Sequence, residues 1–377
     1  MAFYNITNPP THLPMKSSLF SAILCLFLLV TGCTDSKSPQ ADSNTSPSVD
    51  LITSAGFIYE EAPFPSAHAS TIVETPEGMV AAWFGGTAEK DPDVGIWFSR
   101  HLDGAWTSPV EVANGVQSED LRYPTWNPVL FQAPDGPLVL FYKAGPSPQE
   151  WWGLVRTSSD HGQTWSDEYR LPDGILGPIR AKPILIADGS LLAGSSTEHD
   201  GWVVHMERLK APDNGEDMWD VAYLSSSDSW EKVDALNDSD EFGAIQPTIL
   251  VHDDNTLQIL CRSVQDVITE AWSRDGGQSW EPMQATSLPN PSAGVDVVKL
   301  QDGRFLLIYN PTTEGREQLG LAVSSDGINW SDPVLLENQE GEYSYPAIVQ
   351  ATDGMIHITY TWRREKVMHV VMEPEGI

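Results

Sequence analysis

Basic residues are scarce in this chain of 377 residues. It carries 21 Lys and Arg against 53 Asp and Glu, which gives a formal net charge of −32 at pH 7. Such a charge repels nucleic acid phosphates and anionic membrane surfaces over a Debye length of roughly 8–10 Å. Nucleic acid is therefore not an expected partner, and most of the acidic surface is expected to serve solubility. A pocket that gathers several of the few cations would stand out.

The chain also lacks a hydrophobic run of membrane-spanning length. The apolar run from Leu19 to Val30 is shorter than the ~20 residues that a transmembrane helix needs. It leads into Thr31-Gly32-Cys33, an ending typical of a lipoprotein signal. We expect residues 1–32 to be a lipoprotein signal peptide, Cys33 to be lipidated, and the Ser/Asp/Pro-rich residues 33–52 to be a flexible linker. A single lipidated cysteine tethers a protein without spanning the bilayer. The expected location is the cell envelope, either periplasmic or on the outer membrane or cell surface, and the lipid anchor is the only expected membrane contact.

Cysteine is nearly absent. Cys25 and Cys33 belong to the expected signal and anchor, so Cys261 alone remains for the folded domain and no disulfide is available there. Cys261 follows Leu260 in an apolar stretch, with no neighbouring CxxC motif or histidine cluster. It is expected to be a buried structural thiol and not a nucleophile or metal ligand.

Glycine, proline and tryptophan are plentiful, at 29, 28 and 14 residues. This composition is typical of many short strands joined by tight turns, and it favours an all-β fold. A short turn recurs six times, and its Gly or Asn supplies the positive φ that a tight hairpin needs. The six turns are Glu77-Gly78, Asp135-Gly136, Asp188-Gly189, Asp254-Asn255, Asp302-Gly303 and Asp353-Gly354.

Each turn is followed by a mostly apolar strand, such as Met79 to Phe84 or Phe305 to Tyr309, and several are preceded by one that opens with proline, such as Pro247 to Val251. Near-continuous apolarity fits sheets that are packed on both faces, as radially stacked blades are. We therefore predict that residues 53–377 form an all-β, six-bladed β-propeller with four-stranded antiparallel blades.

A second repeat lies between the hairpins. Residues 158–165 and 273–280 both fit the pattern S-x-D-x-G-x-[ST]-W, and weaker copies end at Trp106, Trp230 and Trp330. In such a turn the Asp and Ser side chains cap backbone amides and the Trp packs beneath. With these Asp-boxes at blade spacing, the chain resembles the sialidase (neuraminidase) superfamily. The box itself is structural, so it indicates the fold and leaves the function open.

The resemblance implies three arginines that hold a substrate carboxylate, and the turn residues give a counting origin for each. At the first position this chain has His68, at the second Arg262, and at the third Arg316. Two guanidinium groups converging on one axis would bind a carboxylate bidentately. The alternative for each is an ion pair at a blade edge, since acidic partners abound.

The resemblance also implies a tyrosine nucleophile in the sixth blade, activated by a glutamate from the fourth. The tyrosine offset falls on Tyr345, whereas the family's Tyr-Ser dipeptide is matched by Tyr343-Ser344, so both tyrosines are candidates. The glutamate position holds Gln246, and an amide cannot accept the phenolic proton at neutral pH. The activated pair of an ordinary sialidase is therefore incomplete.

The general acid of the family lies on a first-blade loop that here contains Glu89, Asp91 and Asp93. A carboxyl group whose pKa burial raises toward neutrality could serve. Counting favours Asp91 and Asp93 over Glu89, with solvated loop carboxylates as the alternative for each.

Further polar residues fall at the same axial level by strand counting. Arg180 and Lys182 alternate with period two, so both could face one way and replace the missing first arginine. Trp126 could stack on a sugar ring or simply pack between blades. The remaining candidates for substrate binding are Arg122, Glu198 and Tyr309, with Asn127, Asp296 and Asn310 beside them.

These positions lead to one main functional hypothesis and two alternatives. The first is an exo-acting glycoside hydrolase on a carboxylated sugar, sialic or uronic, with an acidic glycan or oligosaccharide as substrate. The second is a lyase that eliminates across a uronic acid, with His68 as base and Tyr345 or Tyr343 as acid. The third is a glycan-binding surface propeller without catalysis, which Gln246 favours.

No cofactor is expected, because the sequence has no phosphate loop, no Rossmann glycine pattern after a strand and no histidine-rich metal spacing. We assign no metal ligands, and we expect a monomer.

Overall fold

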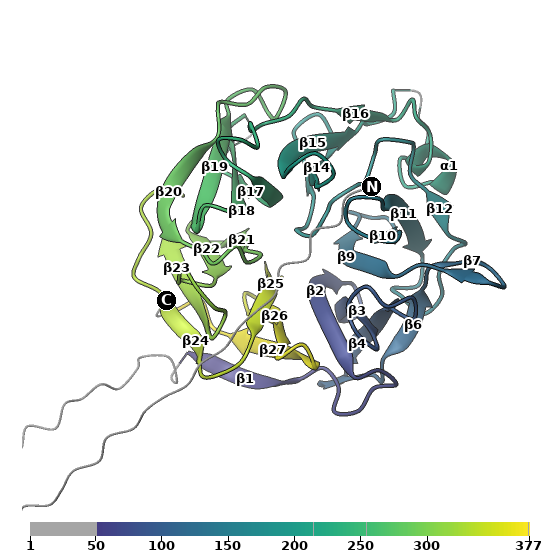
Figure 1. Ribbon diagram of the computed structural model, residues 1–377, viewed down its shortest axis with the longest axis horizontal. Coiled ribbons are helices and arrows are strands. Elements are labelled where there is room, and N and C mark those ends of the chain that lie inside the picture. Colours follow the sequence, from purple (N-terminus) through teal and green to yellow (C-terminus); the bar gives the residue numbers. More distant parts are fainter. Residues whose placement is uncertain (1–50, 214, 254, 376) are drawn as a thin grey trace, which may run out of the picture. The chain divides into compact units, whose positions relative to one another are not determined.

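Strands dominate the computed structural model, which describes residues 51–213, 215–253, 255–375 and 377. The expected signal peptide, the lipidated Cys33 and nearly all of the expected linker lie outside these residues. The strands form six sheets arranged like blades around a central axis (Figure 1). Within the described part of the chain, no helix is long and apolar enough to cross a membrane.

Blades one to three follow one another along the chain, and each runs from an innermost strand outward. The hairpin β7–β8 joins the first blade to the second, and the short helix α1 (Val221–Leu224) lies in the third. Their strands are β2 (Ser66–Thr75), β3 (Gly78–Gly86), β4 (Gly95–Leu102), β5 (Ala105–Trp106) and β6 (Val110–Ala113); β7 (Val116–Ser118) and β8 (Leu121–Arg122); β9 (Thr125–Gln132), β10 (Leu138–Ala144), β11 (Trp152–Ser158) and β12 (Tyr169–Arg170); and β13 (Ile184–Leu185), β14 (Leu191–Thr197), β15 (Val203–Leu209) and β16 (Trp230–Lys232).

Blades four to six repeat the arrangement, and the sixth takes its outermost strand from the start of the described chain. There β1 pairs antiparallel with β27, with Phe57 opposite Met368, so the two ends of the described chain close the ring. Their strands are β17 (Ala244–Val251), β18 (Leu257–Ser263), β19 (Val267–Ser273) and β20 (Gln284–Pro289); β21 (Asp296–Lys299), β22 (Phe305–Tyr309), β23 (Gln318–Ser324) and β24 (Val334–Asn338); and β25 (Tyr343–Gln350), β26 (Ile356–Trp362), β27 (Lys366–Met372) and β1 (Ile52–Phe57).

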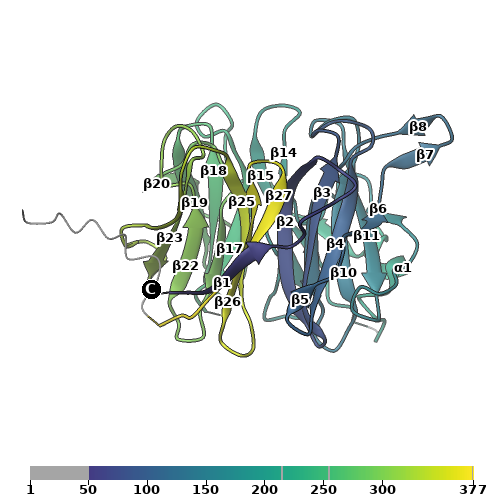
Figure 2. The same cartoon turned by 90° about the horizontal axis from the view of Figure 1, so that it is seen from below.

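The hydrophobic core is divided among the gaps between neighbouring blades. One cluster joins blades one and two, with Phe84 and Tyr142 both buried; the next joins blades two and three, around Phe141 and Trp230. Cys261 is fully buried in the cluster between blades three and four, and burial raises the pKa of its thiol. Because neighbouring blades cover both faces of the inner strands, strands such as β10 and β18 are buried throughout, whereas outermost strands such as β1 and β20 are largely exposed. The side view shows the blades stacked around the axis, with the β7–β8 hairpin projecting beyond them (Figure 2).

Four of the turns that marked the blades have the expected geometry: φ is 126° at Gly78, 83° at Gly189, 95° at Gly303 and 90° at Gly354. Such values suit glycine because it has no Cβ. At Asp135-Gly136 the expectation was wrong, because Asp135 takes the positive φ, at 51°, and Gly136 does not. The Asp-boxes form as predicted: Asp160 Oδ1 accepts from Thr164 N at 2.8 Å, and Asp275 Oδ1 from Ser279 N at 2.9 Å. The predicted all-β, six-bladed propeller with four-stranded antiparallel blades is confirmed.

Candidate active site

A bulge recurs in the innermost strands of four blades and decides where the functional side chains lie. In β2, β9, β17 and β25 the register slips, and the extra residue takes a left-handed backbone conformation. These residues are Ala69 (φ 54°), Asn127 (φ 40°), Gln246 (φ 59°) and Tyr345 (φ 51°).

Proline explains the slip in three of the four strands. Pro128, Pro247 and Pro346 follow the left-handed residue directly, and proline has no N–H to give to the ladder. A left-handed non-glycine residue costs roughly 1–3 kcal/mol, so packing elsewhere must stabilise it. Bulges of this kind re-aim side chains, and they are frequent beside active sites.

The re-aimed side chains line a cavity of about 210 Å³ at the inner ends of the blades. Residues from blades one, two, three, four and six meet there. Its lining consists of His68, Glu89, Lys90, Trp126, Asn127, Pro148, Gln149, Trp151, Glu198, Trp202, Ile245, Gln246, Arg262 and Tyr345. Of the predicted site residues, the structure thus brings together His68, Trp126, Glu198, Gln246, Arg262 and Tyr345.

Tyr345 is surrounded by hydrogen-bond donors. Its Oη accepts from Arg262 Nη1 at 2.6 Å and from Gln246 Nε2 at 3.4 Å. Burial alone would raise the pKa of Tyr345, but Arg262, Arg316 and the Gln246 hydrogen bond outweigh it, so the net shift is downward. The site therefore stabilises the phenolate, which is the nucleophilic form of the side chain.

His68 packs against the same ring. The centroids of the His68 and Tyr345 rings are 4.1 Å apart, and His68 Nδ1 lies 2.9 Å from Thr361 Oγ1. Burial, together with four neighbouring guanidinium groups, lowers the pKa of His68 well below its ordinary value. The imidazole is therefore neutral at neutral pH.

Arg262 and Arg316 both approach the Tyr345 ring, with guanidinium carbons 5.7 and 5.9 Å from its centroid. Arg262 is buried, stacks on Trp202 at 4.9 Å, and its Nε has no hydrogen-bond partner among the described residues. Arg316 Nη1 donates to Glu342 Oε1 at 3.0 Å. A buried guanidinium with an unused donor is suited to hold an anion.

Counting blades missed a third arginine of the site, Arg364. It lies in the tight turn between β26 and β27 with a φ of 61°, and its Nε donates to Glu342 Oε1 at 2.9 Å. Its Nη1 donates to Glu89 Oε2 at 2.6 Å, so Arg364 ties the first-blade loop to the sixth blade. Glu342 thus bridges Arg316 and Arg364. The signal in the sequence was the pair Arg363-Arg364, in a chain poor in arginine, at the end of the strand that follows Gly354.

Arg180 and Lys182 turn toward backbone and carboxylate partners along the axis. Arg180 is buried, and its Nη1 and Nη2 donate to Pro346 O at 2.8 and 2.7 Å. Lys182 Nζ contacts both carboxylate oxygens of Asp296 at 3.0 and 2.9 Å. Arg180 therefore holds the bulge behind Tyr345, and neither cation lines the cavity. Their predicted role in substrate binding stays a prediction.

The acidic loop places Glu89, and not Asp91 or Asp93, at the cavity. Asp93 caps its own loop, since Thr87 N and Thr87 Oγ1 donate to Asp93 Oδ2 at 3.0 and 2.8 Å. Glu198 also lines the cavity, at the end of β14. Burial raises the pKa of Glu198, with Arg262 opposing and Glu89 assisting. The pKa of Glu198 is therefore displaced toward neutrality.

Four further predicted residues lie outside the cavity lining, namely Arg316, which pairs with Glu342, and Tyr343, Tyr309 and Arg122. Tyr343 is buried between blades five and six, and its Oη lies 3.4 Å from Arg363 Nε. Tyr309 is buried between blades four and five, where burial and the Asp332 carboxylate raise its pKa to about 12. Arg122 Nη2 donates to Asp93 O at 2.9 Å and to Glu111. The structure thus separates the two candidate tyrosines.

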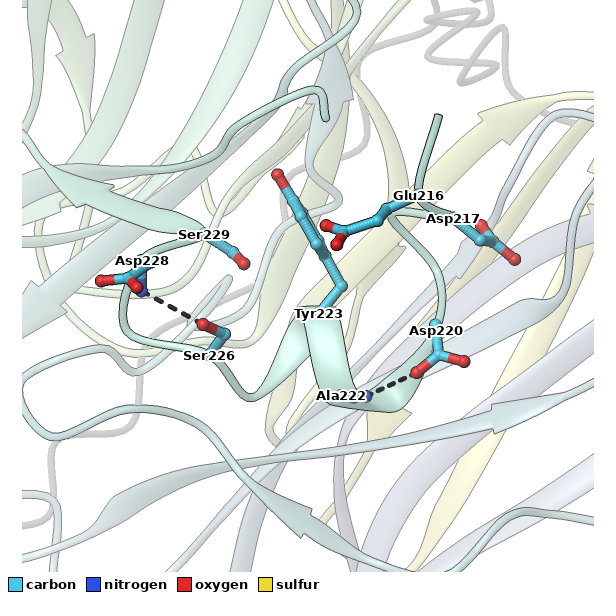
Figure 3. Close-up of a pocket in the computed structure, with 8 residues that line it drawn as sticks. All are labelled: Glu216, Asp217, Asp220, Ala222, Tyr223, Ser226, Asp228 and Ser229. Atoms are coloured by element: carbon cyan, nitrogen blue, oxygen red, sulfur yellow. Dashed lines mark hydrogen bonds between the residues drawn. The ribbon is translucent and has the colours of Figure 1, made fainter. Parts of the chain in front are cut away.

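A larger cavity, of about 540 Å³, lies beside α1 in the third blade (Figure 3). Its lining includes Glu216, Asp217, Asp220 and Asp228 and none of the predicted site residues. Two of its groups serve local turns, since Asp220 Oδ1 accepts from Ala222 N and Ser226 Oγ accepts from Asp228 N. No group of three or more potential metal ligands is arranged to hold an ion in the described residues. An acidic lining opposes a carboxylated substrate, so the smaller cavity, which the buried Arg262 lines beside Tyr345, is the candidate site.

Comparisons with known proteins agree with the fold. No curated protein matches the chain in sequence. Among solved structures, a protein of unknown function from Dyadobacter fermentans is similar with a TM-score of 0.68 at 16% identity, covering 85% of this chain and 98% of that one. A Hadza microbial sialidase has a TM-score of 0.67 at 16% identity and covers 83% of this chain and 66% of that one. The NanB sialidase of Streptococcus pneumoniae has a TM-score of 0.64 at 11% identity and covers 85% of this chain and 70% of that one.

At such identities the structural neighbours establish the fold alone. In sequence, residues 77–358 match the BNR repeat-like domain. The Asp-boxes, the six blades and this match together show that the chain belongs to the BNR repeat-like domain family of sialidase-like propellers.

Proposed function

We propose that the protein is an exo-acting glycoside hydrolase that removes a terminal carboxylated sugar, sialic or uronic, from a glycan. The observation that carries the proposal is the approach of Arg262 and Arg316 to Tyr345 beside a small cavity, with Arg364 joined to Arg316 through Glu342. In a chain with a net charge of −32, such a concentration of cations favours an anionic ligand. Sialidase-fold neighbours at low identity support the same class of substrate.

Tyr345 is the proposed nucleophile. Its phenolate oxygen forms a bond to the anomeric carbon while the glycosidic C–O bond breaks, and the leaving oxygen takes a proton from the Glu198 carboxyl group. Water then attacks the glycosyl–tyrosine bond, the Glu198 carboxylate accepts a proton from that water, and Tyr345 leaves as phenolate. Gln246 donates a hydrogen bond to the phenolate where the family's glutamate would accept the proton, so Arg262 and Arg316 take over the activation.

Arg262 is the sharpest test of substrate binding. Purified protein is incubated with sialyllactose and with oligosaccharides that end in glucuronic or galacturonic acid, and the released acidic sugar is measured. We expect Arg262→Ala to lose about 2 kcal/mol of transition-state binding, a roughly 30-fold fall in kcat/KM. Arg274→Ala is the control, because Arg274 lies in the same blade, is 56% exposed and pairs with Glu281. Unchanged activity in Arg262→Ala contradicts the proposal.

A second candidate is a lyase on the same site. The observation that favours it is the neutral His68 beside Tyr345, whose hydroxyl meets the amide of Gln246 where the family has a glutamate. His68 would remove the proton next to the uronic carboxyl group, and Tyr345 would protonate the leaving oxygen. An unsaturated product that absorbs in the ultraviolet identifies elimination, and its absence from a cleaved sample excludes it. Binding without turnover of any panel member would leave a glycan-binding propeller.

The cellular location is a further proposal. If Cys33 carries a lipid, Cys33→Ala should move the protein from the membrane fraction to the soluble extract of the envelope. Unchanged fractionation would contradict the anchor.

A further inference from the structure

A second cavity of about 220 Å³ adjoins the candidate active site. The two cavities share the side chains of Pro148 and Trp151 as walls. Gly145 allows this arrangement, because a Cβ there would lie 2.5 Å from the Cα of Trp151. Trp151 is therefore held as a partition with space on both sides.

Glu198 marks the boundary between the two cavities. Thr197 and His199 line the second cavity, while Glu198, between them, lines the first. Neighbouring residues at a strand end point to opposite sides, so one segment serves both cavities. A glycosidic oxygen that receives its proton from Glu198 thus lies where the two cavities meet.

The second cavity has walls suited to a sugar. Trp152 is half-buried, packs edge-on against Tyr123 at 5.7 Å and carries the guanidinium of Arg170 at 5.2 Å from its ring centroid. Arg170 is 59% exposed and pairs with Asp173 at 3.4 Å, so these two charges offset each other at the rim, where the exposed Lys232 also lies. Polar groups around an aromatic platform suit a neutral, hydroxylated ring.

We infer that this second cavity binds the leaving-group side of the substrate, a neutral sugar to which the terminal acidic sugar is attached. The inference rests on the proposed hydrolase function and narrows its substrate to an oligosaccharide. Trp152 is then a specificity-determining residue that contacts the second sugar and leaves the acidic one untouched.

Two substrates that differ only in the leaving group test the inference. Sialyllactose should fill both cavities, whereas sialyl fluoride carries a leaving group too small to reach Trp152. If the protein instead acts on a uronic acid, the corresponding glucuronosyl disaccharide and glucuronosyl fluoride take their place. We expect Trp152→Ala to lower kcat/KM about tenfold on the oligosaccharide, which is about 1.4 kcal/mol, with less than a twofold change on the fluoride. Retained fluoride turnover also shows that the variant is folded.

Trp219→Ala is the matched control, because Trp219 is half-buried, contacts Phe131 at 5.5 Å and lines neither cavity. It should leave both rates unchanged. Equal losses on both substrates in Trp152→Ala, or no loss on either, would overturn the inference and leave the hydrolase proposal intact.

Titration with lactose, followed by tryptophan fluorescence, separates the two proposals when neither substrate is turned over. Lactose binding that Trp152→Ala abolishes and Trp219→Ala retains would support the cavity and contradict the hydrolase. Absence of lactose binding in the wild-type protein would overturn the cavity assignment as well.

Discussion

Blades two and four place a cation at the same position in the same strand, and the two cations have opposite surroundings. Arg262 in β18 pairs with Ile245, just before the bulge at Gln246, and Lys143 in β10 pairs with Trp126, just before the bulge at Asn127. Arg262 opens onto the cavity and reaches Tyr345. Lys143 is fully buried, and its Nζ donates to Pro178 O.

The chain that covers Lys143 makes the difference. The segment between β12 and β13 lies over it, and the buried Glu207 holds that segment through Leu176 N and Gly177 N, at 3.1 and 2.6 Å. His205 Nε2 lies 2.8 Å from Glu207 as well. Burial lowers the pKa of Lys143 to about 7, against the opposing effect of Glu207. The repeated fold thus places a cation at the same position in two blades, and the segment that covers Lys143 makes one structural while the other stays open to the cavity.

The largest effect is expected at the cavity that Arg262 and Tyr345 line. Tyr345→Phe should reduce turnover about 10³-fold or more, because the nucleophile is lost, while the unfolding midpoint stays nearly unchanged. Tyr343→Phe is the matched control two residues away, and it should retain activity because Tyr343 lies between blades. Steady-state kinetics on the active oligosaccharide measures both variants. A larger loss of turnover in Tyr343→Phe than in Tyr345→Phe would assign the nucleophile to Tyr343 and contradict the role given to Tyr345.

Glu198→Gln should reduce turnover of the oligosaccharide about 10²-fold, since general acid catalysis contributes typically that much or more. Burial raises the pKa of Glu198. Wild-type activity should therefore decline as the pH rises and the Glu198 carboxyl group loses its proton, at a pH above the ordinary pKa range of a glutamate. The pH–rate profile of the variant should lack that decline. Glu231→Gln is the control, because Glu231 is a 56% exposed glutamate of blade three, and its pH–rate profile should keep the decline. An unaltered profile in Glu198→Gln would exclude Glu198 as the acid.

In blade two, where the segment between β12 and β13 covers Lys143, Lys143→Met should destabilise the fold by about 1–3 kcal/mol, because the buried Pro178 carbonyl oxygen loses its hydrogen-bond donor. Turnover per folded molecule should stay at the wild-type level. Denaturant unfolding followed by tryptophan fluorescence measures the change, and Lys299→Met, an exposed lysine of blade five, serves as control. Lost activity with unchanged stability would show that Lys143 belongs to the site and would remove the contrast between the blades.

The last expected effect is a dependence of stability on pH, through the same lysine. The pKa of Lys143 is about 7 in the folded protein, against an ordinary value of 10.5. Between these values the unfolded chain binds this proton and the folded protein does not, so the free energy of unfolding rises with pH across that window. Lys143→Met should remove this rise relative to the wild type. An identical slope in both proteins, measured by unfolding at pH 7.5 and pH 9.5, would contradict the lowered pKa.

Local features of the sequence predicted the fold, because each turn needs a positive φ and each Asp-box is closed by its own side chains. Counting from those turns also brought His68, Arg262 and Tyr345 to one place, since strand length fixes how far each residue lies along the axis. Counting could not decide between Tyr343 and Tyr345, because the bulge before Pro346 re-aims only the second.

Other parts of the site depend on contacts that the spacing does not encode. Arg180 fits the alternation that predicted it, yet its partner is the carbonyl oxygen of Pro346 on a distant blade. Arg364 was missed because it reaches the site from a turn and not from a strand. Asp93 was preferred over Glu89, whereas the loop closes on Asp93 through Thr87 and presents Glu89 to Arg364.

The central proposal is that the cluster of Arg262, Arg316 and Arg364 holds the carboxylate of a sugar. Calorimetric titration of Tyr345→Phe, which retains the cluster and cannot form the glycosyl–tyrosine bond, tests it with the acidic sugar identified in the panel and with the methyl ester of that sugar. The account predicts that the acid binds and that the ester, which has lost the negative charge, binds at least about tenfold more weakly. Equal affinity for the acid and its ester would contradict it.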